Sequence, residues 1–353
     1  MRRRHILGLA AAILLAAGPA LTQGTALAQT PQAGRITPEL IEAARKEGKV
    51  VWYTSVDLQV AERIAKAFEA KHPGVPVQVE RSGAERIFQR LAQERGSNIK
   101  VADVVNSSDA AHFIIWKRDG WLAPYVPEDV AQHYAPEHRD ADGMYATWRA
   151  SLSVIGYNTK LVKPEDAPKS FADLLDPRWT GKIVKAHPGY SGTILTATFQ
   201  TSRDLGWSFY EKLAKQRVMQ VQSATEPPKK IAIGERAIMA DGAEYSLILA
   251  KEAGSPVEIV YPAEGAPFVA GPSGIFADAP HPNAARLFQS YLFTAEAQQL
   301  IIDVGGLRSL HPLVKEHAGR RALKDIKLMK EDAKAVEEQV EAIKQQYVRY
   351  FRT

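Results

Sequence analysis

Patterns of buried strand and amphipathic helix alternate along the first third of the chain, and this alternation constrains the fold more than any other feature of the sequence. Residues 49–54 form an apolar run typical of a buried strand, and the next segment places Val60, Ile64 and Phe68 on one helical face. The pattern continues with a strand at 75–79, a helix at 85–94, a strand at 102–105 and a helix from 111 to 119. Such units predict an α/β fold with a mixed, mostly parallel sheet flanked by helices.

The ends of these strands carry small hydroxyl and charged side chains. Ser55 and Asp57 follow the first strand, Arg81 follows the second, and Ser107 and Ser108 follow the third. The carboxyl ends of parallel strands lie at one edge of a sheet, where open α/β folds place their ligands. We therefore expect these residues to face a common binding site.

A second candidate site lies where the strand at 182–186 gives way to a helix. Pro188 and Gly189 interrupt the apolar run, and the helix is expected to begin near Ser191, Gly192 and Thr193. A helix start presents free N–H groups and a partial positive charge, and a glycine there lets a ligand approach the backbone. These residues therefore suit an anion, although an ordinary capped helix has the same sequence pattern.

Further polar side chains follow strands in the middle of the chain. Glu244 and Tyr245 come after a predicted strand that begins at Arg236. Arg149 lies in residues 144–158, which alternate like a strand and are predicted to cross between two lobes, and residues 267–275 are expected to cross back. Arg81 and Arg149 can hold an anion bidentately, although a surface or hinge ion pair is an equally good explanation of either.

The C-terminal tail shows apolar residues spaced by three and four from Leu323 to Tyr350, which predicts one amphipathic helix. Two explanations of its apolar face remain open. The helix docks on the first lobe of its own chain, or it pairs with a partner as a coiled coil.

Length and composition point to an exported protein with two cores. The chain has 353 residues, and residues 1–28 combine a basic start, a short apolar run and the small-x-small pattern Ala26-Leu27-Ala28 of a cleaved signal peptide. The pair Arg3-Arg4 leaves general and twin-arginine export both open. With no cysteine, the mature chain has no disulfide and no lipid anchor, so we expect a free periplasmic protein.

Charge and motifs exclude several function classes. Removing the three arginines of the signal peptide leaves 42 basic against 40 acidic residues, a net charge of +2 that does not favour nucleic acid. No metalloprotease, nucleophile-elbow, P-loop or dinucleotide-binding pattern occurs, and four of the nine histidines precede prolines in turn-like contexts. The chain is therefore predicted not to be an enzyme and to need no cofactor.

The order of elements resembles the type II periplasmic solute-binding proteins of ABC importers, most closely the subgroup of ferric-iron-binding proteins. The resemblance is carried by residues 51–55, 102–105, 120–125, 155–162, 191–193, 234–235 and 295–299. It implies two lobes joined by two crossing strands that close over a ligand. The expected boundaries are 29–148 with 276–353 for the first lobe and 149–275 for the second.

The resemblance also implies ligands and partners. In the ferric-binding relatives two adjacent tyrosines hold iron, and here the matching pair is Glu244 and Tyr245, so Asp57, Glu244 and Tyr245 form the candidate set for transported Fe(III). The relatives bind an anion at the helix start matching residues 191–193, with Ser223 nearby. The chain is thus expected to be a monomer that delivers ferric iron or a small organic anion, bearing phosphate, phosphonate or carboxylate, to an inner-membrane permease. A ligand-sensing receptor component or an enzyme on the same fold is the alternative.

Overall fold

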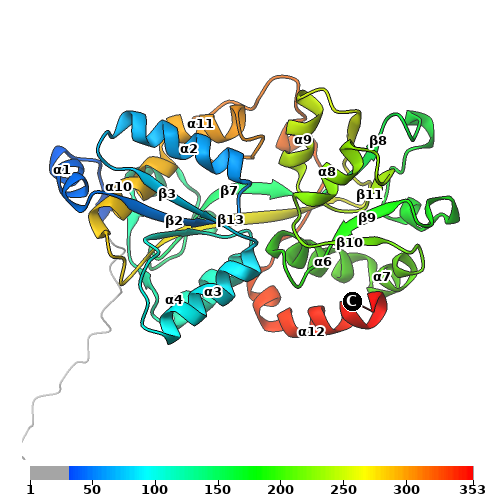
Figure 1. Cartoon of the computed structure of the whole chain (residues 1–353), viewed down its shortest axis with the longest axis horizontal. Helices are drawn as coiled ribbons and strands as arrows, with labels where there is room; N and C mark the ends of the chain where they lie inside the picture. Colours follow the sequence, from blue (N-terminus) through cyan, green and yellow to red (C-terminus); the bar gives the residue numbers. More distant parts are fainter. Residues whose placement is uncertain (1–31, 353) are drawn as a thin grey trace, which may run out of the picture.

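The computed structural model of the chain describes residues 32–352, which fold into two α/β bodies joined near the centre of the molecule (Figure 1). The signal peptide predicted for residues 1–28 lies outside the described residues. Within 32–352 no helix is long and apolar enough to cross a membrane. We call the two bodies the first and the second lobe, with the predicted boundaries.

The helices are α1 Pro38–Glu47, α2 Leu58–Lys71, α3 Ala84–Gly96, α4 Ala110–Arg118, α5 Glu128–His133, α6 Gly192–Leu205, α7 Trp207–Ala214, α8 Glu226–Ala232, α9 Glu244–Glu252, α10 Pro282–Phe293, α11 Ala295–Asp303 and α12 Ala333–Phe351. The strands are β1 Ala33–Gly34, β2 Val50–Thr54, β3 Val77–Arg81, β4 Val104–Asn106, β5 Leu122–Ala123, β6 Val126–Pro127, β7 Ala146–Leu152, β8 Ile155–Asn158, β9 Ile183–Ala186, β10 Met219–Val221, β11 Ile238–Met239, β12 Val257–Val260, β13 Ala266–Phe276 and β14 Leu328–Met329. Short 3₁₀ turns cover Pro136–His138, Pro164–Asp166, Ala172–Leu175, Pro177–Trp179 and Leu323–Asp325.

The first lobe is built on a sheet with the strand order β14-β13-β4-β2-β3, to which β5 and β7 add through β13. β2 pairs in parallel with both β3 and β4, as the strand–helix pattern predicts. Trp52 at the centre of β2 packs its ring against Phe288 of α10, with 5.2 Å between centroids, whereas Val51 and Tyr53 face the apolar side chains of α3 and α4. Successive residues of β2 therefore bury both faces of the sheet.

The second lobe repeats this plan on a smaller sheet with the strand order β10-β9-β11-β8-β12. Helix α7 covers one face, where Phe209 and Tyr210 pack with Ile183, and the side chains of α8 and α9 cover the other. β9 is parallel to β10 and β11, so the loops after these strands open at one edge. β8 runs antiparallel to β11 and β12, which makes the sheet mixed.

β7 and β13 are the two strands that connect the lobes, and they pair with each other in antiparallel register. The sequence predicts one continuous strand over 144–158, but the structure interrupts it between β7 and β8. Ser153 there forms an isolated bridge to Ala243, and Val154 N donates to Gly242 O at 3.1 Å. The interruption lets the chain leave the first sheet and enter the second. The exact residues at which the lobes divide remain a prediction.

The C-terminal tail differs from its prediction in two respects. Helix α12 begins only at Ala333, because Leu328–Met329 is an extended strand paired with β13 and Asp332 caps the helix through Ala335 N. Its buried side chains do not rest on the first lobe alone. Val336 and Ile343 pack with side chains of both α4 and α6, so α12 spans the two lobes along one side of the molecule (Figure 1).

Candidate functional site

Loops at the carboxyl ends of strands from both lobes meet in the space between the lobes. Arg149 Nη2 donates to Ser55 Oγ at 3.4 Å, and Arg81 Nη2 donates to Ser223 Oγ at 3.2 Å. The backbone N–H of Asp57 donates to Tyr245 Oη at 3.1 Å. Three contacts therefore join residues that lie far apart in the sequence, and the lobes touch across the cleft.

The start of α6 is pressed against the first lobe. A Cβ atom added to Gly192 would lie 2.6 Å from Asp109 Cβ, and one added to Gly83 would lie 2.7 Å from Tyr190 O. Only glycine permits this approach. The helix start predicted to bind an anion thus faces the loop that contains Ser108.

Ser191 occupies the N-cap position of α6, but its side chain makes no capping hydrogen bond. The residue is only 5% exposed, so its hydroxyl lies at the closed cleft without a helix N–H to accept from. The hydroxyls of Ser108 and Thr193, both buried, likewise make no hydrogen bond within residues 32–352. These three hydroxyl groups remain free to bind a ligand.

Arg149 has the most unusual environment of the charged groups in the cleft. It projects from β7, it is 2% exposed, and no carboxylate of the described chain lies within ion-pair distance. Its Nε atom is buried without an acceptor. Burial lowers the pKa of Arg149, and the neighbouring Tyr245 offsets only part of that effect. A buried guanidinium without a counter-charge is costly, so the closed cleft lacks a negative charge at this point.

Tyr245 and Asp57 lie next to each other but are engaged with protein groups. Burial raises the pKa of Tyr245, although Arg149 and Arg81 each lower it. Asp57 caps α2, since its Oδ1 accepts from Gln59 N at 3.2 Å, and its Oδ2 lies 3.5 Å from Lys229 Nζ. Tyr245 is therefore a neutral phenol in this structure, and Asp57 already has partners.

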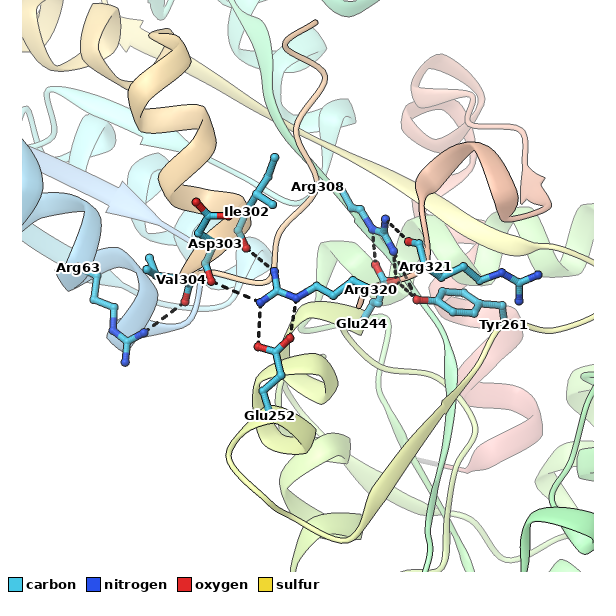
Figure 2. Close-up of polar contacts among 10 residues, drawn as sticks. All are labelled: Arg63, Glu244, Glu252, Tyr261, Ile302, Asp303, Val304, Arg308, Arg320 and Arg321. Carbon is cyan, nitrogen blue, oxygen red and sulfur yellow. Dashed lines mark hydrogen bonds and ion pairs between the residues drawn. The ribbon is translucent and has the colours of Figure 1, made fainter. Parts of the chain in front are cut away.

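Glu244 is turned away from the cleft residues, contrary to the expectation that it supplies a ligand oxygen. Figure 2 shows its carboxylate held by Arg308, with Nη2 at 2.7 Å from Oε1 and Nε at 3.1 Å from Oε2, and by the Tyr261 hydroxyl at 2.5 Å. The side chain is 1% exposed. Both oxygens are thus used to anchor the first turn of α9.

A second arginine in Figure 2 ties the other end of α9 to the first lobe. Arg320 pairs with Glu252 in a bidentate contact, with 2.7 and 2.8 Å between nitrogen and oxygen, and it also donates to the carbonyl of Ile302 in α11. The segment after α11 therefore links α11 to both ends of α9. This segment therefore positions α9, whose first turn contains Tyr245.

Ser107 is also directed into the protein rather than into the cleft. Its hydroxyl lies 3.1 Å from His112 Nδ1 and accepts a hydrogen bond from Asp109 N, and His112 Nε2 lies 3.0 Å from Glu85. Burial alone would lower the pKa of His112, but the carboxylates of Asp109 and Glu85 raise it. Ser107 therefore fixes the shape of the loop from inside.

The structure thus brings together most of the residues predicted from the sequence. Those that lie at the cleft are Ser55, Asp57, Arg81, Ser108, Arg149, Ser191, Gly192, Thr193, Ser223 and Tyr245, and those directed elsewhere are Ser107 and Glu244. Sequence reasoning missed Lys229, which pairs with Asp57, and Arg86, which contacts Gln222 across the cleft. Arg86 lies in the first turn of α3, five residues after Arg81, and this nearness in sequence was the available signal.

Comparison with known sequences decides the family. The profile of the bacterial extracellular solute-binding proteins matches residues 100–330, more than half of the chain. The chain belongs to this family. The family is defined by solute binding, and membership of it gives no information about catalysis.

Three curated relatives extend the comparison. An uncharacterised protein of Haemophilus influenzae is 26% identical to this solute-binding protein over 269 residues, which cover 73% of this chain and 76% of the relative. Iron uptake protein A1 of Synechocystis is 26% identical over 185 residues, 52% of this chain and 48% of its own. The probable ABC transporter periplasmic-binding protein y4fP of Sinorhizobium fredii is 24% identical and covers 65% and 66%.

Solved structures confirm the two-lobed fold. The periplasmic binding protein AfuA from Actinobacillus pleuropneumoniae matches with a TM-score of 0.78 at 23% identity, covering 86% of this chain and 99% of AfuA. Iron-bound HitA from Pseudomonas aeruginosa matches with a TM-score of 0.72 at 20% identity, covering 85% and 99%. These likenesses confirm the predicted two-lobed α/β fold, and the family membership confirms the predicted solute-binding class.

Proposed function

We propose that this solute-binding protein captures a small anion between its lobes and delivers it to an inner-membrane permease. The observation that carries the proposal is Arg149, a fully buried guanidinium without a carboxylate partner among residues 32–352. An anion supplies the missing counter-charge there. The helix start at Ser191 and the free hydroxyl groups around it supply hydrogen-bond donors for its oxygens.

The same groups explain how a ligand favours the closed form. In an open cleft water solvates Arg149, whereas closure removes that water and leaves the charge uncompensated. An anion that touches Ser55 of the first lobe, beside Arg149, and Ser223 of the second lobe gains contacts with both lobes only when they close. Binding therefore shifts the equilibrium toward the closed form by the difference in affinity between the two states.

The relatives support an anion bearing phosphate as one ligand class. The solved structure of AfuA holds fructose-6-phosphate, which shows that the fold accepts a phosphorylated organic ligand in that protein. The relative y4fP is named as a periplasmic-binding protein of an ABC transporter. We extend both to this chain as parts of the proposal, together with a monomeric state and a periplasmic location after signal-peptide cleavage.

Ferric iron is the second candidate, because two relatives are named for iron uptake or Fe(3+) binding and HitA holds iron. The cleft fits it less well. Fe(III) favours anionic oxygen ligands, whereas Asp57 is engaged with α2 and Lys229, and Glu244 is paired with Arg308. We therefore favour the anion over the metal.

An enzyme would need a reactive group, and the one suggestive arrangement serves another purpose. Ser107, His112 and Glu85 are connected in the order of a hydrolytic triad. The serine is 0% exposed, however, and its oxygen already accepts from Asp109 N. We infer that this group stabilises the loop after β4 and performs no catalysis.

The test is calorimetric titration of the mature protein with phosphate, methylphosphonate and acetate, beside visible absorption with ferric citrate. Ser191→Asp should abolish binding of the anion that the wild type binds, because it adds a negative charge at the cradle. Ser208→Asp is the matched control, since it places the same charge in the first turn of α7 at an exposed position. Equal loss in both variants, or a charge-transfer band with ferric citrate that Tyr245→Phe removes, would count against the anion.

A further inference from the structure

A pocket lined in part by Arg81 and Ser223 opens next to the proposed anion site. It has a volume of about 160 Å³ and takes its walls from both lobes. Arg81, Gly83 and Arg86 come from the end of β3 and the start of α3, and Tyr190, Gln222 and Ser223 come from the second lobe. A ligand in this pocket therefore also touches both lobes when they close.

The pocket is positively charged and its arginines have no carboxylate partner within the described chain. Arg81 donates to the Val56 carbonyl at 3.2 Å and to the Ser223 hydroxyl, both neutral groups. Arg86 donates to the side-chain oxygen of Gln222, and its guanidinium lies 5.8 Å from the centre of the Tyr190 ring. The pocket thus contains two guanidinium groups that are solvated or bound to neutral oxygens only.

The one carboxylate in the pocket wall does not neutralise these groups. Glu226 lies in the first turn of α8, where its Oε1 accepts a hydrogen bond from Ser223 N at 2.8 Å. That contact closes the turn before the helix, as a capping carboxylate does. Two positive charges therefore face one negative charge that is engaged elsewhere.

The pocket and the anion site are connected through one short loop. Ser55 accepts from Arg149, and the next residue, Val56, accepts from Arg81 through its carbonyl. The positive charges of Arg149 and Arg81 also both lie near Tyr245, where each opposes the rise in the pKa of Tyr245 that burial causes. The two arginines thus lie on either side of the same cleft residues, and Arg86 extends the positive charge outward from Arg81.

From this arrangement, and resting on the proposed function, we propose that the solute carries two separated anionic groups. The inner group neutralises Arg149, and the outer group is bound by Arg81 and Arg86. The class is an organic molecule with a phosphate or phosphonate at one end and a second phosphate or a carboxylate at the other. Tyr190, 42% exposed beside Arg86, offers a flat wall for the carbon skeleton between them.

A single inorganic anion uses this surface poorly. It can occupy the inner site or the outer one, but it leaves at least one unpartnered guanidinium without a counter-charge. Charge-assisted hydrogen bonds are about twice as strong as neutral ones, and Arg forms them bidentately with carboxylate and phosphate. Affinity is therefore expected to rise when one ligand supplies both groups.

The test uses two matched pairs of probes that differ in one anionic group. Glycerol 3-phosphate is compared with 3-phosphoglycerate, and fructose 6-phosphate with fructose 1,6-bisphosphate, by calorimetric titration of the mature protein. In at least one pair the probe with two anionic groups should bind about tenfold tighter or more. Arg86→Gln should weaken binding of that probe about tenfold more than binding of its partner.

Arg90→Gln serves as the matched control, because Arg90 lies one turn further along α3 and pairs with Glu80 and Glu94 outside the cleft. It should leave the preference as in the wild type. Equal affinities within both pairs, or an equal effect of Arg86→Gln on both members, overturn the inference while the proposed anion function stands. If none of these probes binds the wild type, and phosphate, methylphosphonate and acetate do not bind either, the proposed function itself is refuted, and the inference falls with it.

Discussion

The charge of Arg149 is predicted to hold the ligand-free protein open, and Arg149→Met tests this directly. Methionine keeps a long, flexible side chain at the crossing strand but removes the guanidinium. In the closed structure that group is 2% exposed, its single polar partner within the described chain is Ser55 Oγ at 3.4 Å, and its Nε has no acceptor. Closure without a ligand therefore buries a nearly uncompensated charge.

The size of the effect follows from the cost of such a charge. An ion left buried after losing its partner destabilises a protein by about 3 to 5 kcal/mol. The weak contact with Ser55 offsets some of this, which leaves about 3 kcal/mol against the empty closed form. Because each 1.4 kcal/mol changes an equilibrium constant about tenfold, Arg149 should lower the closed-to-open ratio of the empty protein by roughly a hundredfold.

Because the sequence contains no cysteine, dyes can be attached specifically at two introduced cysteines to test this prediction. Ile99→Cys in the first lobe and Ile233→Cys in the second, 48% and 75% exposed, allow a pair of dyes to report the distance between the lobes by energy transfer. The wild type should change its signal when an anion is added. Arg149→Met should show the closed signal without a ligand and respond to no anion.

Arg63→Met is the control, because it removes the same charge from an exposed position of the first lobe, where Arg63 donates to the Val304 carbonyl (Figure 2). It should behave as the wild type does. If empty Arg149→Met remains as open as the empty wild type, the charge does not govern closure and the reasoning is refuted. Unfolding of the variant is detected separately by circular dichroism.

Three further predictions concern buried charges outside the cleft, and urea unfolding measures each. Burial raises the pKa of Glu331 to about 7, so the folded protein keeps a proton that the unfolded chain loses near pH 4.5. The free energy of unfolding should therefore fall as pH rises from about 4.5 to 7, and Glu331→Gln should recover up to about 3 kcal/mol at pH 8 but little at pH 4. Lys344→Met should cost about 1 to 3 kcal/mol, because Lys344 of α12 pairs at 2.8 Å with the buried Glu85, and no loss would show that this contact contributes nothing. Glu244→Gln should cost about 3 to 5 kcal/mol, because it leaves the buried Arg308 with only the distant carboxylate of Glu316 at 4.0 Å among the described residues, whereas an unchanged midpoint would contradict the anchoring role of that pair.

Elements with local signals were predictable from the sequence. Thr37 accepts a hydrogen bond from Leu40 N at the start of α1, and Gly48 ends the helix with a left-handed φ of 83°. Both features depend on residues a few positions apart, and capping chemistry is the same in any fold. The helix start at Ser191 was found from the local break at Pro188 and Gly189, although the Ser191 side chain makes no capping hydrogen bond.

Elements whose partners are distant in the sequence were not predictable in the same way. The spacing of apolar residues from Leu323 onward continues through Met329, but β13 provides a strand edge there, and pairing with it replaces the helix. Glu244 was assigned to a ligand because it takes the place of one of the two adjacent tyrosines of the ferric-binding relatives. Its partner Arg308 lies 64 residues away, and only the packed chain brings the two together.

The sequence by itself determined the family, the α/β class and the residues at the strand ends, because these depend on periodicity, local turns and the order of elements. Only the tertiary structure decided which of those residues face one another. Arg149 illustrates the difference. Its identity and strand position are visible in the sequence, but the lack of a counter-charge around it depends on every segment packed nearby, and that lack is what makes it a candidate ligand site.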